Sequence, residues 1–192
     1  MRVSVIAGLL LTIIAGYFIL KELNTYSEAK KEFFSVIRKG DLAGVKKILD
    51  SGQDINVRDG VGQTALHIAA YKGTPEIVDL LIDSGANIDA EDNRGGKPIH
   101  WAAIKGSIDN VEVLIKRGAK LNVRDKNGDT PLHWAVGGIG VLPQRKYITV
   151  AYMLNQKADP NIKNEQGKTP LKMAQQKDDE MMINLLRPET DY

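Results

Sequence analysis

A four-residue segment that recurs along the sequence constrains this chain more than any other feature. The first three copies begin at a constant interval, and the fourth follows after a somewhat longer one: Thr64–His67, Lys97–His100, Thr130–His133 and Thr169–Lys172. Threonine is a good N-cap, and proline one position later already has the φ angle of a first helical turn. The recurrence therefore predicts that each copy starts a helix within a repeated unit.

Fixed offsets around this segment define the rest of the unit. An Asp or Asn and then a Gly precede every copy, at Asp59 and Gly62, Asp92 and Gly95, Asp125 and Gly128, and Asn164 and Gly167. Glycine accepts the positive φ that a tight turn requires. The first three copies continue into two apolar stretches with helical spacing. Each unit is therefore predicted to contain a turn, an inner helix and an outer helix.

These residues resemble the ankyrin repeat, and the resemblance covers about residues 27–187. It implies an all-α solenoid of stacked helix–turn–helix units with β-hairpin loops, because one unit has too little core to be stable alone. Within a domain of residues 27–188, the expected units are an N-terminal cap at 27–58, repeats at 59–91, 92–124 and 125–163, and a C-terminal cap at 164–188.

The resemblance also implies where a protein partner binds. Ankyrin-repeat proteins hold partners with the tips of their loops and the exposed side of their inner helices. Carried onto this sequence, with the two tryptophans that follow histidines, those positions are Arg38, Lys39, Val61, Gln63, Tyr71, Lys72, Asn93, Arg94, Trp101, Ile104, Lys105, Lys126, Asn127, Asp129 and Trp134. The set is more basic than acidic, which favours an acidic epitope on the partner. The tryptophan pair fits either partial core or a binding hot spot.

All three histidines of the chain, His67, His100 and His133, occupy one repeat position. A metal ion would need them within about 2 Å of one point, whereas equivalent positions of packed helices lie about 10 Å apart. We expect each imidazole to bond to backbone and to the threonine that starts its segment, with a weaker network where Lys97 replaces that threonine. No catalytic, cofactor-binding or metal-binding residues are expected.

Composition limits the partner classes further. The formal net charge is +2, so there is no bulk electrostatic case for nucleic acid. The chain has 0 cysteines, which excludes disulfides, thiolate metal sites and a cysteine nucleophile. The ankyrin domain is expected to be monomeric, with polar caps at both ends.

An uncharged apolar run precedes the repeats. Residues 3–20 carry no charge, and 18 helical residues span about 27 Å, close to the hydrocarbon thickness of a bilayer. We expect residues 1–21 to be an uncleaved membrane anchor; a cleaved signal segment, or neither, are the alternatives. Arg2 before the run favours an ankyrin domain outside the cytoplasm, in a bacterial periplasm; the alternative is the cytoplasmic face of the membrane.

The third repeat departs from the constant period. Its longer interval predicts about six extra residues between its two helices, in the region 137–146, which is rich in glycine. Such a loop fits either a functional contact or an insertion tolerated at the surface.

The leading functional hypothesis is a non-catalytic protein-interaction module, anchored in a membrane or exported, that binds a protein target on its concave face. Some bacterial ankyrin proteins with similar N-termini act as inhibitors or immunity proteins, so such a role is expected by analogy. The alternative is a scaffold subunit of a membrane complex. An enzyme would need a further domain to hold its chemistry, and the repeats leave no room for one.

Overall fold

The fold was analysed in a computed structural model that describes residues 19, 21, 25, 27–138 and 142–187. The predicted N-terminal hydrophobic helix lies outside these residues, apart from isolated positions at its end. Among the described residues, no helix is both long enough and apolar enough to cross a membrane.

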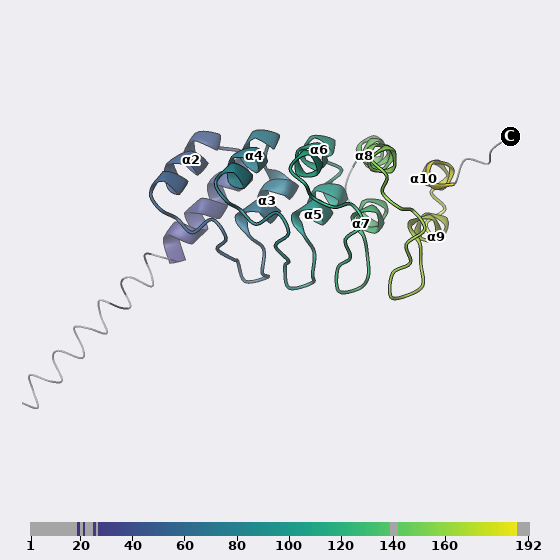
Figure 1. The fold of residues 1–192 in the computed structure, drawn as a ribbon, viewed down its shortest axis with the longest axis horizontal. Helices are drawn as coiled ribbons and strands as arrows, with labels where there is room; N and C mark the ends of the chain where they lie inside the picture. Colours follow the sequence, from purple (N-terminus) through teal and green to yellow (C-terminus); the bar gives the residue numbers. More distant parts are fainter. Residues whose placement is uncertain (1–18, 20, 22–24, 26, 139–141, 188–192) are drawn as a thin grey trace, which may run out of the picture.

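Helices stack in two layers (Figure 1). Residues 27–39 are helical, and α2 (Leu42–Asp50) follows them. The inner layer continues with α3 (Ala65–Lys72), α5 (Pro98–Lys105), α7 (Pro131–Gly137) and α9 (Pro170–Gln175), and the outer layer with α4 (Pro75–Asp83), α6 (Ile108–Lys116), α8 (Pro143–Asn155) and α10 (Glu180–Leu186). Loops at one edge lead into each inner helix. The all-helical repeat solenoid expected from the sequence is thus confirmed.

The inner helices α3, α5, α7 and α9 begin at the recurring four-residue segments, as predicted. Thr64, Lys97, Thr130 and Thr169 are the N-caps of α3, α5, α7 and α9, all with extended backbone. The Thr130 hydroxyl accepts from the His133 N–H at 3.5 Å, and the Thr169 hydroxyl accepts from the Lys172 N–H at 3.2 Å. A side chain that accepts an unpaired N–H in this way stabilises a first helical turn.

One Asp or Asn side chain shapes each loop. Asp59 Oδ1 accepts from the N–H groups of Val61 and Gln63, at 3.0 and 2.9 Å, and Gly62 completes the turn with φ of 80°. Asp92, Asp125 and Asn164 repeat this arrangement. Among the described residues the expected β-hairpins reduce to an isolated bridge between Arg58 and Thr64, without named strands.

The histidines join neighbouring repeats. His67 Nδ1 accepts the Thr64 N–H at 3.1 Å, and Nε2 lies 2.9 Å from the Gly96 carbonyl oxygen in the next loop. His100 and His133 make the same link to the carbonyls of Asp129 and Lys168, at 3.1 and 3.0 Å. Because Nδ1 accepts, each ring is neutral and donates from Nε2.

The threonine contribution differs between repeats as predicted. The hydroxyls of Thr64 and Thr130 lie 2.9 and 2.8 Å from Nδ1 of their histidines. Lys97 offers His100 only its backbone N–H, at 3.0 Å, and its ammonium pairs with Asp89 at 3.1 Å. His100 therefore has the smaller set of hydrogen bonds.

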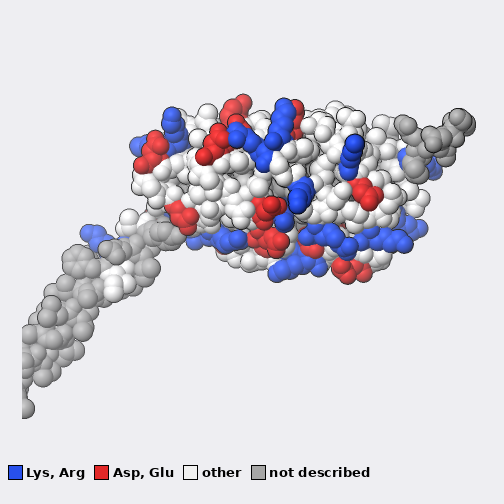
Figure 2. Space-filling model, viewed as in Figure 1, with Lys and Arg blue, Asp and Glu red and all other residues white. Residues whose placement is uncertain are grey.

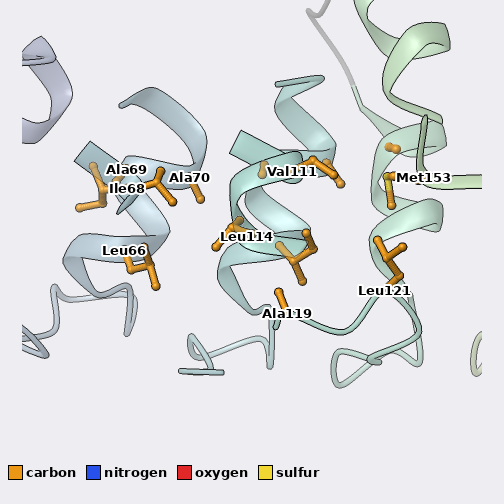
Figure 3. Packing of buried hydrophobic residues seen from close by; sticks show 14 of the residues in the cluster. Leu66, Ile68, Ala69, Ala70, Val111, Leu114, Ala119, Leu121 and Met153 are labelled. Atoms are coloured by element: carbon orange, nitrogen blue, oxygen red, sulfur yellow. The ribbon is translucent and has the colours of Figure 1, made fainter. Parts of the chain in front are cut away.

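A continuous apolar core lies between the two helix layers. Leu66, Ile68, Val111, Leu114 and Met153 come from α3, α6 and α8 and point into this layer (Figure 3). All five are at most 4% exposed. Since buried side chains of each unit pack against the next unit, the stack is stabilised by contacts between repeats rather than within one.

The extra residues of the third repeat are placed differently from the prediction. We expected all of them between the two helices. Instead α8 has 13 residues against 9 in α4 and in α6, so much of the insertion extends the outer helix. Residues 139–141 of the expected loop lie outside the described residues. Leu142, at the start of α8, is 66% exposed.

The longer α8 binds the C-terminal cap. Lys146 Nζ donates to Asp179 Oδ2 at 2.9 Å, and the Tyr147 hydroxyl donates to Asp179 Oδ1 at 2.9 Å. Asp179 is also the N-cap of α10 and accepts from the Met182 N–H. Burial alone would raise the pKa of the Asp179 carboxyl, but hydrogen bonds from Lys146, the Met182 N–H and Tyr147 hold it below its ordinary value. The insertion therefore strengthens the end of the solenoid.

Candidate functional site

An aromatic row crosses three inner helices. Tyr71 of α3, Trp101 of α5 and Trp134 of α7 meet edge to face, with ring centres 5.7 and 5.5 Å apart. Such pairs contribute about 0.5–1.5 kcal/mol beyond the area they bury. Tyr71 and Trp101 are half-buried, whereas Trp134 is 8% exposed. The row is therefore half-buried at the first repeat and becomes part of the core at the third.

The loop aspartates hold the two tryptophans in place. Trp101 Nε1 donates to Asp92 Oδ2 at 2.9 Å, and Trp134 Nε1 donates to Asp125 Oδ2 at 3.0 Å. The other oxygen of each carboxylate shapes the loop described above. Gly96 lies directly against Trp134, since a Cβ there would be 2.9 Å from the ring. Loops and aromatic row thus form one rigid surface.

Cations cover the aromatic rings. The Arg94 guanidinium lies 5.2 Å from the centre of the Trp101 ring and 5.0 Å from that of Trp134. Lys72 and Lys105 lie 5.5 and 5.4 Å from the centre of the Tyr71 ring. Within the described part of the chain, none of these three cations has a carboxylate at ion-pair distance. Their positive charge is therefore available to a partner.

A pocket of about 200 Å³ lies at the end of the row. Ile104, Trp134, Gly137 and Met173 form its apolar wall, and Arg94 lies at its rim. The polar residues that complete the lining are Asp125, Asn127, Asp129 and His133. The pocket spans the junction of three successive units, α5, α7 and α9.

The remaining residues predicted to bind a partner lie at loop tips and helix ends. Val61 is 57% exposed, and Asn93, Lys126 and Asn127 are exposed at neighbouring loop tips. Backbone hydrogen bonds link these tips, as from the Lys126 N–H to the Arg94 carbonyl at 3.0 Å. Figure 2, in the orientation of Figure 1, shows Lys and Arg gathered along this loop edge, with carboxylates between them. The loops therefore form a single charged border.

Not all members of the predicted set are fully exposed. Gln63 and Asp129 are half-buried, and Trp134 belongs largely to the core. Asp129 Oδ1 accepts from Asn164 Nδ2 at 2.7 Å, which joins two loops. Arg38 and Lys39 are exposed at the end of the helix of residues 27–39, where Arg38 lies over Phe34.

Sequence reasoning missed the residues that support the row and close the pocket. Asp92 and Asp125 were predicted only as turn residues, yet each also binds a tryptophan. Met173 and Gly137 line the pocket and were not selected. Gly137 had a signal in the sequence, because it lies one repeat period after Ile104, just as Ile104 lies one period after Tyr71. Because Gly137 has no side chain, the pocket is open at this position.

The outer helices form the convex face, and the charged residues of α4 and α6 differ from those of the aromatic row. Arg117, the C-cap of α6, binds Asp79 and Asp83 of α4, both at 2.7 Å, and Glu112 pairs with Lys116 at 2.6 Å. These exposed pairs contribute little to stability. Lys116 and Arg117 are thus paired with carboxylates, unlike the three cations of the aromatic row.

Stacked two-helix units joined by linked loops define a helical repeat solenoid. A family model described as ankyrin repeats in 3 copies matches residues 33–125, and a model described as the ankyrin repeat matches residues 127–165. The chain belongs to the ankyrin-repeat family. Ankyrin-repeat proteins are generally non-catalytic and bind protein partners, so this chain carries a protein–protein interaction module.

Similarity to curated proteins is confined to the repeats. Serine/threonine-protein kinase 12 of Arabidopsis thaliana is 48% identical over 42 residues, which are 22% of this chain and 9% of the kinase. Ankyrin repeat domain-containing protein 46 of Rattus norvegicus and that of Mus musculus are each 36% identical over 58 residues, 30% of this chain and 25% of theirs. The matches thus cover a quarter or less of these relatives.

Proposed function

We propose that this chain binds a protein target with an acidic epitope on the concave face formed by the loop tips and inner helices. The observation that carries the proposal is the row of Tyr71, Trp101 and Trp134 under the unpaired cations Lys72, Arg94 and Lys105. Tryptophan, tyrosine and arginine dominate binding energy when a partner excludes water around them. Unpaired cations steer an acidic partner and select against a basic one.

Alanine substitutions test the choice of face. Tyr71→Ala, Arg94→Ala, Trp101→Ala and Ile104→Ala should each weaken binding of the isolated target, at least one by about 2 kcal/mol or more. Glu76→Ala and Glu112→Ala on the outer helices are the controls and should leave the Kd unchanged. Melting temperatures of all variants separate lost contacts from lost folding. Binding that survives the concave changes but fails in the outer-helix variants would assign the site to the convex face.

The proposal also puts this module at a membrane. Its support is the uncharged run of residues 3–20, which is long enough to span a bilayer as a helix. Under this proposal the ankyrin domain lies outside the cytoplasm, and the target is an exported or membrane-bound protein that the chain holds or inhibits. Membrane fractionation of the full chain tests the anchor. An intact full-length chain in the soluble fraction would contradict it.

A further inference from the structure

The pocket at the end of the aromatic row exists because one repeat position lacks a side chain. Tyr71, Ile104 and Gly137 occupy the same repeat position in α3, α5 and α7. In the first two repeats this position carries a large side chain on the concave face. In the third it carries only hydrogen, and the pocket of about 200 Å³ opens beside Gly137.

The walls of this pocket fit an apolar occupant of definite size. Ile104, Trp134 and Met173 surround the vacant position. A dry apolar cavity of about 150 Å³ accommodates benzene, so the volume here suffices for one aromatic or large aliphatic side chain. Ile104 and Met173 are half-exposed, and burying their apolar surface under such a side chain is favourable.

Two cations beside the pocket can bind acidic groups. Arg94 lines the pocket and has no carboxylate at ion-pair distance among the described residues. Lys126, at the neighbouring loop tip, donates to the Asn93 carbonyl at 3.0 Å, and its charge is likewise unpaired there. The pocket's own carboxylates are already engaged, Asp125 by Trp134 and two backbone N–H groups and Asp129 by Asn164.

We propose that this pocket anchors one aromatic or large aliphatic side chain of the protein target, presented by a segment with acidic residues on either side of it. The inference rests on the proposed function and names the feature of the epitope that the concave face selects. The anchor side chain fills the space beside Gly137, and the flanking carboxylates pair with Arg94 and Lys126. The other cations of the concave face then add affinity but do not determine which side chain enters the pocket.

The geometry around Gly137 allows a substitution that fills the pocket without damaging the fold. A Cβ at Gly137 would lie 3.6 Å from Met173 Cε, an ordinary contact with the end of a flexible side chain. Gly137 is also in helix α7, where glycine is less favourable than other residues. Gly137→Ile copies the residue that the second repeat has at this position and should fold at least as stably as the natural chain.

The experiment is selection of phage-displayed random dodecapeptides on the immobilised full chain in detergent. We expect the selected peptides to contain one aromatic or large aliphatic residue with Asp or Glu nearby. Their Kd for Gly137→Ile should rise about tenfold or more, while thermal stability is unchanged or higher. Glu76→Ile is the control, because it adds the same side chain at an exposed position of the outer helix α4, outside the proposed binding face. It should bind like the natural chain.

The outcomes separate this inference from the proposed function. Acidic peptides that bind Gly137→Ile as tightly as the natural chain but lose affinity for Trp101→Ala would overturn the pocket and leave the concave face standing. Peptides that respond only to Glu76→Ala or Glu112→Ala would overturn both. A basic consensus, or no enrichment above a blank surface, would also overturn the pocket assignment.

Discussion

The guanidinium carbon of Arg94 lies 5.0 Å from the centre of the Trp134 ring, so a loop side chain of one repeat covers an inner-helix ring of the next. It lies at a similar distance, 5.2 Å, from the Trp101 ring. One exposed cation thus joins the charged loop edge to the aromatic row. Arg94 therefore contributes to packing, and under the proposed function it also contributes to partner recognition.

Arg94→Ala should therefore affect binding more than folding. An exposed cation–π contact contributes about 0.5–1 kcal/mol, so the free energy of unfolding in urea should fall by about that amount. The Kd for an acidic target should rise by a larger factor, because the charge is lost as well. Arg124→Ala is the matched control, since Arg124 is already paired with Glu165 at 2.9 Å. Equal losses of affinity in the two variants would contradict a specific contribution of Arg94 to target binding.

The buried histidines make stability depend on pH. Burial lowers the pKa of His67, and burial lowers that of His100 to about 4 despite the opposing hydrogen bond to the Asp129 carbonyl. In the unfolded chain these two imidazoles bind protons near pH 6.5, whereas in the folded chain the buried rings stay neutral at that pH. The free energy of unfolding is therefore not reduced by these histidines above pH 6.5. It falls as the pH decreases from 6.5 toward 4, by about 3 kcal/mol for His100.

Urea unfolding between pH 7.5 and pH 5 measures this effect. The slope of unfolding free energy against pH should be shallower in His100→Ala than in the natural chain, because one titrating group is gone. Greater stability at pH 5 than at pH 7.5, or an unchanged slope in the variant, would contradict the neutral buried ring.

Two threonines at the same repeat position separate capping from the bond to histidine. Thr130 contacts His133 Nδ1 at 2.8 Å, whereas Thr169 is followed by Lys172 and acts only as an N-cap. Thr130→Val should thus cost more stability than Thr169→Val, by about 0.5–1.5 kcal/mol, the contribution of one hydrogen bond. Urea midpoints measured on both variants test this. Equal losses would show that the hydroxyl contributes nothing to the histidine link.

Among the described helices, Asp179 should be the strongest N-cap. It binds Lys146 and Tyr147 in addition to the Met182 N–H, whereas Asp41 caps α2 through the Gly44 N–H. A cap contributes about 1 kcal/mol, and hydrogen bonds to a charged group add about 1.5–3 kcal/mol. Asp179→Ala should therefore destabilise the chain more than Asp41→Ala does, with faster amide exchange in α10. Similar exchange in both variants would contradict a locked C-terminal cap.

The repeat period predicted the elements because each local signal agreed with the stacking. The tetrapeptides marked the N-caps of four inner helices, and the loop aspartates marked the turns. The period could not show that Asp92 and Asp125 also bind tryptophans, since those bonds depend on how a loop packs on its inner helix. The insertion was misplaced because spacing alone does not distinguish a longer loop from a longer α8.

The candidate surface was predictable in position but not in detail. Tyr71, Arg94, Trp101 and Ile104 lie together as expected from the family pattern. Trp134 is mostly core, because Gly96 lets the loop of the preceding repeat lie against its ring. The pocket was missed because sequence comparison of repeats draws attention to the side chains present, and here the absent one at Gly137 matters.

The chain's 2 tryptophans, Trp101 and Trp134, both lie in the aromatic row, so their fluorescence tests the central claim directly. Acrylamide quenching is measured on the full chain, alone and saturated with its isolated protein target. We predict a marked fall in the quenching constant on binding, because the target covers half-exposed Trp101. The Glu76→Ala and Glu112→Ala variants should show the same fall. An unchanged quenching constant at saturation would mean that the target binds elsewhere, and it would contradict the concave-face account.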